Sequence, residues 1–260
     1  MTTNEPVALH HLLEGPEDAS VPVMANSLGA TLNMWDQQSG ILRDHFRLLR
    51  YDHRGHGDFP VPPGPYTIDG LGRDVLALLD RLEIQGFSFC GLSIGGMVGM
   101  WLASEVPERV ERLVLCCTSP RFVPPDAWDS RAAAVRADGV DAIAGAVLER
   151  WFTQVLHESH PEVVEWAGQM LRDTPAEGYA GCCEAIRDAD LNYRLGAIRA
   201  PTLVIAGAND PAAPVEQAEA IRDGIPDARL VVIPQAAHLA NVEQPEDFTR
   251  AMLDHLGTER

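Results

Sequence analysis

Residues 90–96 read CGLSIGG and place Ser93 between Gly91 and Gly95, at the end of an uncharged and largely apolar run. Glycines two residues before and two residues after the serine let a strand and a helix approach closely, because neither glycine carries a Cβ atom. The pattern predicts a sharp strand-to-helix turn that exposes the Ser93 hydroxyl. Such a turn is typical of a nucleophilic serine.

Short apolar segments and helical segments alternate on both sides of this turn. The segment 67–82 carries leucines and Val75 at helical spacing, and a second helix is expected directly after Ser93. Strands are expected at 21–25, 46–51, 87–90, 112–117, 202–207 and 229–233. This alternation predicts an α/β fold with a mostly parallel central sheet that is covered by helices on both faces.

The alternation stops near Pro120. From 121 to 195 the sequence is helix-rich, contains several aromatic residues and lacks a convincing strand. We therefore expect residues 1–120 and 196–260 to form one core domain, and residues 121–195 to form a helical cap inserted over the edge of the sheet. An insertion at this place is suited to covering a substrate.

Composition narrows the class of protein. The 260 residues, 46% of them hydrophobic, suffice for one domain with a large core. The formal net charge of -18 opposes binding to nucleic acid and to anionic membranes. Acidic residues in 1–20 argue against a secretory signal, and glycines in the uncharged run 86–103 argue against a membrane span. The cysteines lack CxxC spacing, so we expect reduced core thiols in a cytoplasmic protein. The sequence does not decide the oligomeric state, and a homo-oligomer is possible.

Two further polar residues follow predicted strands. Asp210 comes after the strand 202–207, and His238 comes after the strand 229–233. The carboxyl ends of parallel strands meet at one edge of the sheet, where ligands bind. Alone, a loop aspartate is usually a turn residue and a lone histidine is usually at the surface. Together with Ser93, in the order nucleophile, acid, histidine, they predict a catalytic triad.

The triad assigns a role to each side chain. His238 takes the proton of Ser93 as a general base, and Asp210 orients the imidazole and stabilises its charged form. Two main-chain N–H groups are needed for the oxyanion. One is that of Ile94, at the start of the helix, and the other is expected from Leu28 in the loop after the strand 21–25.

Seven stretches between Leu13 and Leu256 carry a family signature: NSLGATLNMW (26–35), YDHRGHG (51–57), PPGPYTIDGLGRDVLALLD (62–80), GLSIGGMVG (91–99), GYAGCCEAIRDADL (178–191), PTLVIAGANDPAAP (201–214) and AAHLANVEQP (236–245). They resemble the 3-oxoadipate enol-lactonases, a family of the α/β-hydrolase superfamily in aromatic catabolism. The resemblance implies a serine hydrolase that opens a carboxylate-bearing enol-lactone through an acyl-enzyme. It implies no metal ion and no organic cofactor.

The carboxylate of that substrate requires a local cation, because the overall charge repels an anion. The candidates are cap arginines: Arg131, Arg136, Arg150 and Arg187. An arginine can hold a carboxylate through two hydrogen bonds. We favour Arg131 for this contact, with Trp151 as an apolar wall of the substrate site.

Other functions remain as alternatives. The same triad could serve another lactone, a small ester or a peracid, and His53 stands where the resemblance leads us to expect a smaller polar residue. A non-catalytic binder of small molecules on this fold is a further alternative, although a binder has no need for an ordered triad. A metal site could be suggested by Asp52, His53, His56 and Asp58. Zinc hydrolases need ligands from further strands, however, so we expect a structured loop.

Overall fold

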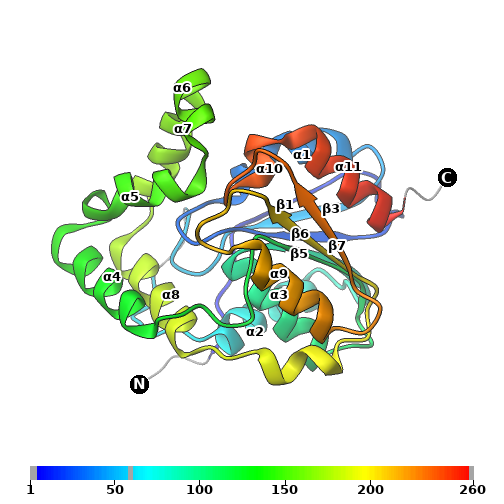
Figure 1. Cartoon of the computed structure of the whole chain (residues 1–260). Coiled ribbons are helices and arrows are strands. Elements are labelled where there is room, and N and C mark those ends of the chain that lie inside the picture. The colour runs from blue at the N-terminus through cyan, green and yellow to red at the C-terminus, as the bar shows by residue number, and fades with distance from the viewer. Residues whose placement is uncertain (1–4, 58–60, 258–260) are drawn as a thin grey trace.

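The computed structural model describes residues 5–57 and 61–257, and its centre is a seven-stranded sheet (Figure 1). The strand order is β1-β3-β2-β4-β5-β6-β7; β1 is antiparallel to β3, and all other neighbours are parallel. The strands are β1 His11–Glu14, β2 Pro22–Ala25, β3 Leu48–Tyr51, β4 Phe87–Leu92, β5 Val110–Cys116, β6 Thr202–Gly207 and β7 Arg229–Ile233. The predicted mostly parallel sheet is confirmed.

Strand β1 is the element that the sequence pattern misses. It has four residues, pairs only with β3 and is only partly buried, so it lacks the apolar run of a central strand. Strands β6 and β7 have the predicted bounds, and β2, β3, β4 and β5 lie where they are predicted, with changed ends. Strand β4 continues to Leu92, directly before the serine, and the predicted segment 46–51 is a strand only over β3.

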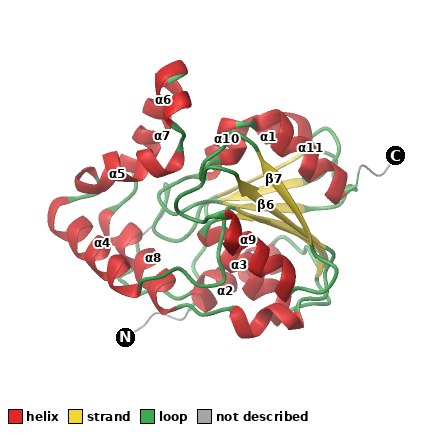
Figure 2. Ribbon diagram, in the orientation of Figure 1, coloured by secondary structure: helices red, strands yellow, loops and turns green. Residues whose placement is uncertain are grey.

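Helices cover both faces of the sheet, as Figure 2 shows. On one face lie α2 (Ile68–Arg81), α3 (Ile94–Glu105) and α9 (Val215–Gly224), and on the other lie α1 (Asp36–Leu42), α10 (Ala240–Glu243) and α11 (Pro245–Leu256). The predicted helix 67–82 is α2, which begins after Thr67 because that side chain accepts the N–H of Gly70 at 2.9 Å. Two 3-10 helices, η1 (Leu32–Trp35) and η2 (Asn192–Ala197), complete the connections.

Five helices are inserted between β5 and β6: α4 (Pro125–Asp138), α5 (Asp141–Trp151), α6 (Gln154–Ser159), α7 (Pro161–Arg172) and α8 (Ala176–Asp188). In Figure 1 this α4–α8 insertion lies to the left of the sheet, and α4 packs along α8. Proline in the first turn of α4 and of α7 supports the start of each helix, since its fixed φ suits that position.

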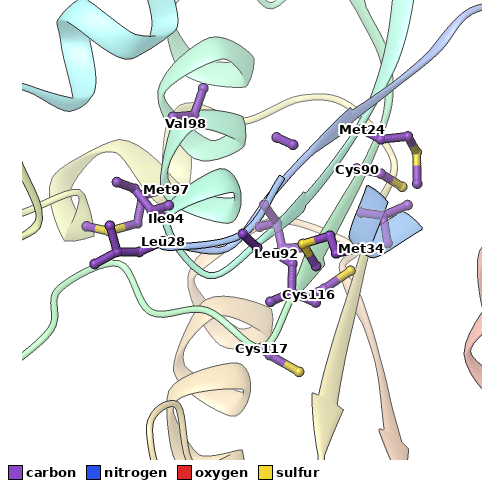
Figure 3. Packing of buried hydrophobic residues seen from close by; sticks show 14 of the residues in the cluster. Met24, Leu28, Met34, Cys90, Leu92, Ile94, Met97, Val98, Cys116 and Cys117 are labelled. Carbon is purple, nitrogen blue, oxygen red and sulfur yellow. The ribbon is translucent and has the colours of Figure 1, made fainter. Parts of the chain in front are cut away.

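The core fills the space between the sheet and its helices. Figure 3 shows part of it around β2, β4 and β5, including Met24, Leu92 and Cys116. Strand β4 is buried along its whole length and α3 along most of it, because both lie at the centre of the domain. The five cysteines are buried free thiols. Within residues 5–57 and 61–257, no helix is long and apolar enough to cross a bilayer.

Candidate active site

Ser93 occupies a strained turn between β4 and α3. Its φ of 59° and ψ of -118° lie in a region that side chains rarely adopt, and its N–H donates to the Cys116 carbonyl at 2.9 Å. The flanking glycines are sterically required. A Cβ on Gly91 would lie 2.1 Å from the Gly95 oxygen, and a Cβ on Gly95 would lie 2.5 Å from the Ala25 oxygen. The two glycines therefore let β2, β4 and α3 meet at the serine.

Asp210 and His238 are hydrogen-bonded to each other beyond the ends of β6 and β7. His238 Nδ1 lies 2.8 Å from Asp210 Oδ2, and both residues are 4% exposed. The other oxygen, Oδ1, accepts the N–H groups of Ala212 at 2.8 Å and Ala213 at 3.0 Å. Because the carboxylate accepts at Nδ1, the proton of a neutral His238 lies on that nitrogen, and Nε2 is left as the basic atom.

Ser93 and His238 line the same cavity, which has a volume of about 350 Å³. Ser27 and Leu28, from the loop after β2, lie beside them. The α4–α8 insertion forms the opposite wall of the cavity with the side chains of Trp128, Arg131, Val147, Arg150, Trp151 and Tyr179. The structure thus brings a hydroxyl, an oriented imidazole and two guanidinium groups to one cavity.

The loop after β2 makes a tight turn over the start of α3. Gly29 has a φ of 80°, and the N–H of Ala30 donates to the Ser27 carbonyl at 3.1 Å. Within the described part of the chain, the main-chain N–H groups of Leu28 and Ile94 have no acceptor. Two donors left free beside a serine are what an oxyanion requires.

A buried polar network holds this loop in place. The N–H of Gly29 donates to His56 Nε2 at 3.0 Å, and the N–H of Leu32 donates to Asp52 Oδ1 at 2.6 Å. The Asn26 carbonyl accepts from His53 Nε2 at 3.0 Å and from the N–H of Gly95 at 3.2 Å. The loop and the start of α3 are therefore bonded to each other directly.

The histidines of this network are held as neutral rings. Burial, with the nearby His56, lowers the pKa of His53 from 6.5 to about 3. Burial also lowers the pKa of His56. His56 can accept the Gly29 N–H only while its Nε2 carries no proton. Asp58, the fourth residue of the metal-site alternative, lies outside the described residues, and the residues described contain no cluster of three or more acids, histidines or cysteines that could hold a metal ion.

Two of the four candidate arginines face the cavity, and two do not. Arg136 and Arg187 form ion pairs with carboxylates of the insertion. Arg131 and Arg150 line the cavity, and neither has a carboxylate partner among residues 5–57 and 61–257. The Arg131 guanidinium lies 4.6 Å from the centre of the Trp128 ring. Burial and the charge of Arg131 lower the pKa of Arg150.

Comparison with known proteins identifies the family of this chain. Residues 23–245 match the alpha/beta hydrolase fold family. The chain is 42% identical over 250 residues to 3-oxoadipate enol-lactonase 2 of Acinetobacter baylyi, which covers 96% of this chain and 93% of that protein. This chain belongs to the 3-oxoadipate enol-lactonase family of α/β hydrolases.

Solved structures agree with that membership. The enol-lactonase from Burkholderia xenovorans LB400 superposes with a TM-score of 0.93 at 43% identity, covering 95% of this chain and 96% of that chain. A hydrolase from Pseudomonas aeruginosa PA01 gives a TM-score of 0.93 at 48% identity, covering 96% of this chain and 94% of that chain. The predicted family and fold are confirmed, and this member of the enol-lactonase family is an enzyme that hydrolyses ester bonds.

Sequence reasoning missed several residues that shape the site of this α/β hydrolase. Asn26 and His56 hold the loop that carries Leu28, and neither was predicted to do so. Asn26 lies in NSLG and His56 in RGHG, and both motifs belong to the family stretches. The spacing of the two motifs does not predict that these residues hold the loop. Their role depends on three loops that are distant in sequence.

Proposed function

We propose that this protein hydrolyses a carboxylate-bearing enol-lactone, 3-oxoadipate enol-lactone, to 3-oxoadipate in the catabolism of aromatic compounds. One observation carries the proposal. The cavity that contains Ser93 and His238 also contains Arg131 and Arg150, two cations without a carboxylate partner in the described chain. Membership of the enol-lactonase family points to the same substrate.

The reaction begins with the serine. As His238 Nε2 removes the Ser93 hydroxyl proton, Oγ attacks the lactone carbonyl, and the N–H groups of Leu28 and Ile94 bind the resulting oxyanion. Asp210 holds the ring through Nδ1 and stabilises the imidazolium. The carbon–oxygen bond of the ring then breaks, the leaving oxygen takes the proton from His238, and the enol tautomerises to a ketone.

Water completes the reaction. It attacks the acyl carbonyl as His238 removes its proton, and Ser93 leaves with that proton, which releases the second carboxylate of the product. No metal ion and no organic cofactor takes part in this scheme. An enol is a better leaving group than an alkoxide, so ring opening needs little further activation.

Arg131 is proposed to hold the pendant carboxylate of the substrate, with Arg150 as its neighbour and Trp151 as the apolar wall. The Trp128 ring lies against the Arg131 guanidinium and limits its motion, which lowers the entropy lost on binding. Residues 121–195 are proposed to act as the cap of this site and residues 1–120 and 196–260 as its core. Buried free thiols suit a reducing compartment, and we assign the protein to the cytoplasm.

The experiment compares wild type, Ser93→Ala and Ser104→Ala, a control substitution of another serine near the far end of α3. Each is mixed with 3-oxoadipate enol-lactone, and the loss of its absorbance is followed. Wild type and the control should consume the lactone, and Ser93→Ala should be slower by at least about a thousandfold. Hydrolysis of a simple aryl ester without consumption of the lactone would overturn the substrate. Equal rates with and without Ser93 would overturn the triad.

A further inference from the structure

A buried carboxylate lies beside residues 234–239, the loop between β7 and α10 that carries His238, here called the histidine loop. This carboxylate has no role in the chemistry proposed above. Glu243, the last residue of α10, is 7% exposed and forms no ion pair with any described residue. Its oxygens accept hydrogen bonds from the Ala237 N–H at 2.7 Å, from the Thr153 N–H at 3.0 Å and from the Thr153 hydroxyl. A buried charge balanced only by neutral donors is costly to keep, which indicates a specific task.

The two oxygens of Glu243 contact different parts of the molecule. Oε2 accepts from Ala237, the residue before His238. Oε1 accepts from Thr153, which lies between α5 and α6 and two residues after Trp151. One carboxylate therefore joins the histidine loop to residues 151–153 of the insertion, here called the α5–α6 corner.

A second bond joins the same two segments. The N–H of Leu239, the residue after His238, donates to the Trp151 carbonyl at 3.0 Å. The Trp151 side chain is 3% exposed and lines the cavity. Both neighbours of His238 are thus tied to the α5–α6 corner, one directly and one through Glu243.

From these contacts we infer that Glu243 is a positioning residue, which fixes His238 and the Trp151 wall of the cavity relative to each other. The inference rests on the role proposed for His238. A carboxylate is the suitable group here because all its partners are donors. A glutamine of the same length has one acceptor oxygen, and its NH₂ group would face an N–H of Ala237 or of Thr153. Glu243 thus forms a bridge between Ala237 and Thr153, and the change to glutamine breaks the hydrogen bond to one of these two residues.

Four variants test the bridge. Glu243→Gln alters its centre, and Thr153→Val removes the hydroxyl donor on the insertion side. Thr153→Ser keeps that donor and also keeps the cap of α6, where the hydroxyl accepts the Leu156 N–H. Gln244→Ala, on the adjacent half-buried residue, is the matched control. Active sites are counted with a fluorophosphonate, and kcat and KM are measured with the enol-lactone and with p-nitrophenyl acetate.

Kinetics with the two substrates distinguish the effect of the bridge on His238 from its effect on the Trp151 wall. Glu243→Gln should lower kcat per titrated site about 10–100-fold with both substrates, because a misplaced base slows every acyl transfer. Thr153→Val should keep kcat with p-nitrophenyl acetate and raise KM severalfold with the enol-lactone alone, since only the lactone carries the carboxylate that is proposed to lie at Arg131 and the Trp151 wall. Thr153→Ser and Gln244→Ala should resemble wild type.

A purely structural role gives a different result. If Glu243→Gln lowers the melting temperature but keeps kcat per titrated site within about twofold of wild type, the inference is wrong. If Glu243→Gln does not fold, the threonine pair decides, and equal KM values for Thr153→Val and Thr153→Ser overturn it. A wild type that reacts with the phosphonate and the ester but not the lactone contradicts only the proposed substrate, and the ester data still test Glu243.

Discussion

Acid should destabilise this protein through His53, which is buried as a neutral ring. The side chain is 1% exposed, and its Nε2 donates to the Asn26 carbonyl at 3.0 Å. Burial, with the nearby His56, lowers its pKa from 6.5 to about 3. Between these two values the unfolded chain binds a proton at His53 and the native protein does not. The free energy of unfolding therefore falls as the pH falls below 6.5.

The size of the effect follows from this pKa difference. Going from pH 7 to pH 5, a histidine that titrates near 6.5 when unfolded and near 3 when native costs about 2 kcal/mol of stability. Replacement of His53 by glutamine removes the titration while an amide nitrogen can still donate to the Asn26 carbonyl. The variant should therefore lose about 2 kcal/mol less than wild type over this pH range.

Urea unfolding at the two pH values, followed by circular dichroism, measures this difference. His45→Gln, at an exposed histidine before β3, is the matched control and should keep the pH response of wild type. If His53→Gln and wild type lose equal stability between pH 7 and pH 5, His53 is not held neutral in the native protein, and the account of the buried network around Asn26 is wrong.

Three further substitutions probe the site. Gly95→Ala should lower the free energy of unfolding by about 1–3 kcal/mol in urea, because its Cβ would lie 2.5 Å from the main-chain oxygen at the end of β2; full stability would contradict the close approach. Arg131→Gln and Arg150→Gln should each raise KM about 10–100-fold for the carboxylate-bearing lactone and little for a neutral aryl ester. Arg187→Gln, outside the cavity, is their control, and equal effects on both substrates would argue against a carboxylate contact. Asp210→Asn should lower kcat by about four orders of magnitude without unfolding the protein, since the amide disfavours the required tautomer of the histidine; a loss below tenfold would refute the role of this acid.

Local patterns are sufficient to predict the elements that carry the proposed triad. The glycines around Ser93 specify a turn by sterics alone. Asp210 follows the buried strand β6, and His238 follows β7, an apolar run that forms a partly exposed edge strand. The rule that parallel strands end at one edge then places all three together. Strand β1 escapes this reasoning because an edge strand needs no apolar run.

Residues that act through long-range contacts could not be predicted in this way. Glu243 contacts Thr153 across 90 residues of sequence, and His56 contacts Gly29 across 27. The choice among the arginines of the α4–α8 insertion also depends on packing. Arg136 resembles Arg131 in sequence, since both lie on α4, but only the fold shows which one meets a carboxylate and which one meets the cavity.

The charge at the cavity has the opposite sign to the net charge of the molecule. The formal net charge is -18, and the other arginines of the α4–α8 insertion lie in ion pairs. Arg131 and Arg150 thus provide local positive potential that can hold a carboxylate against the overall field. Hydrolysis of the proposed lactone creates a second carboxylate, which the net negative charge of the molecule repels. The same distribution that lets one carboxylate bind therefore favours release of the product.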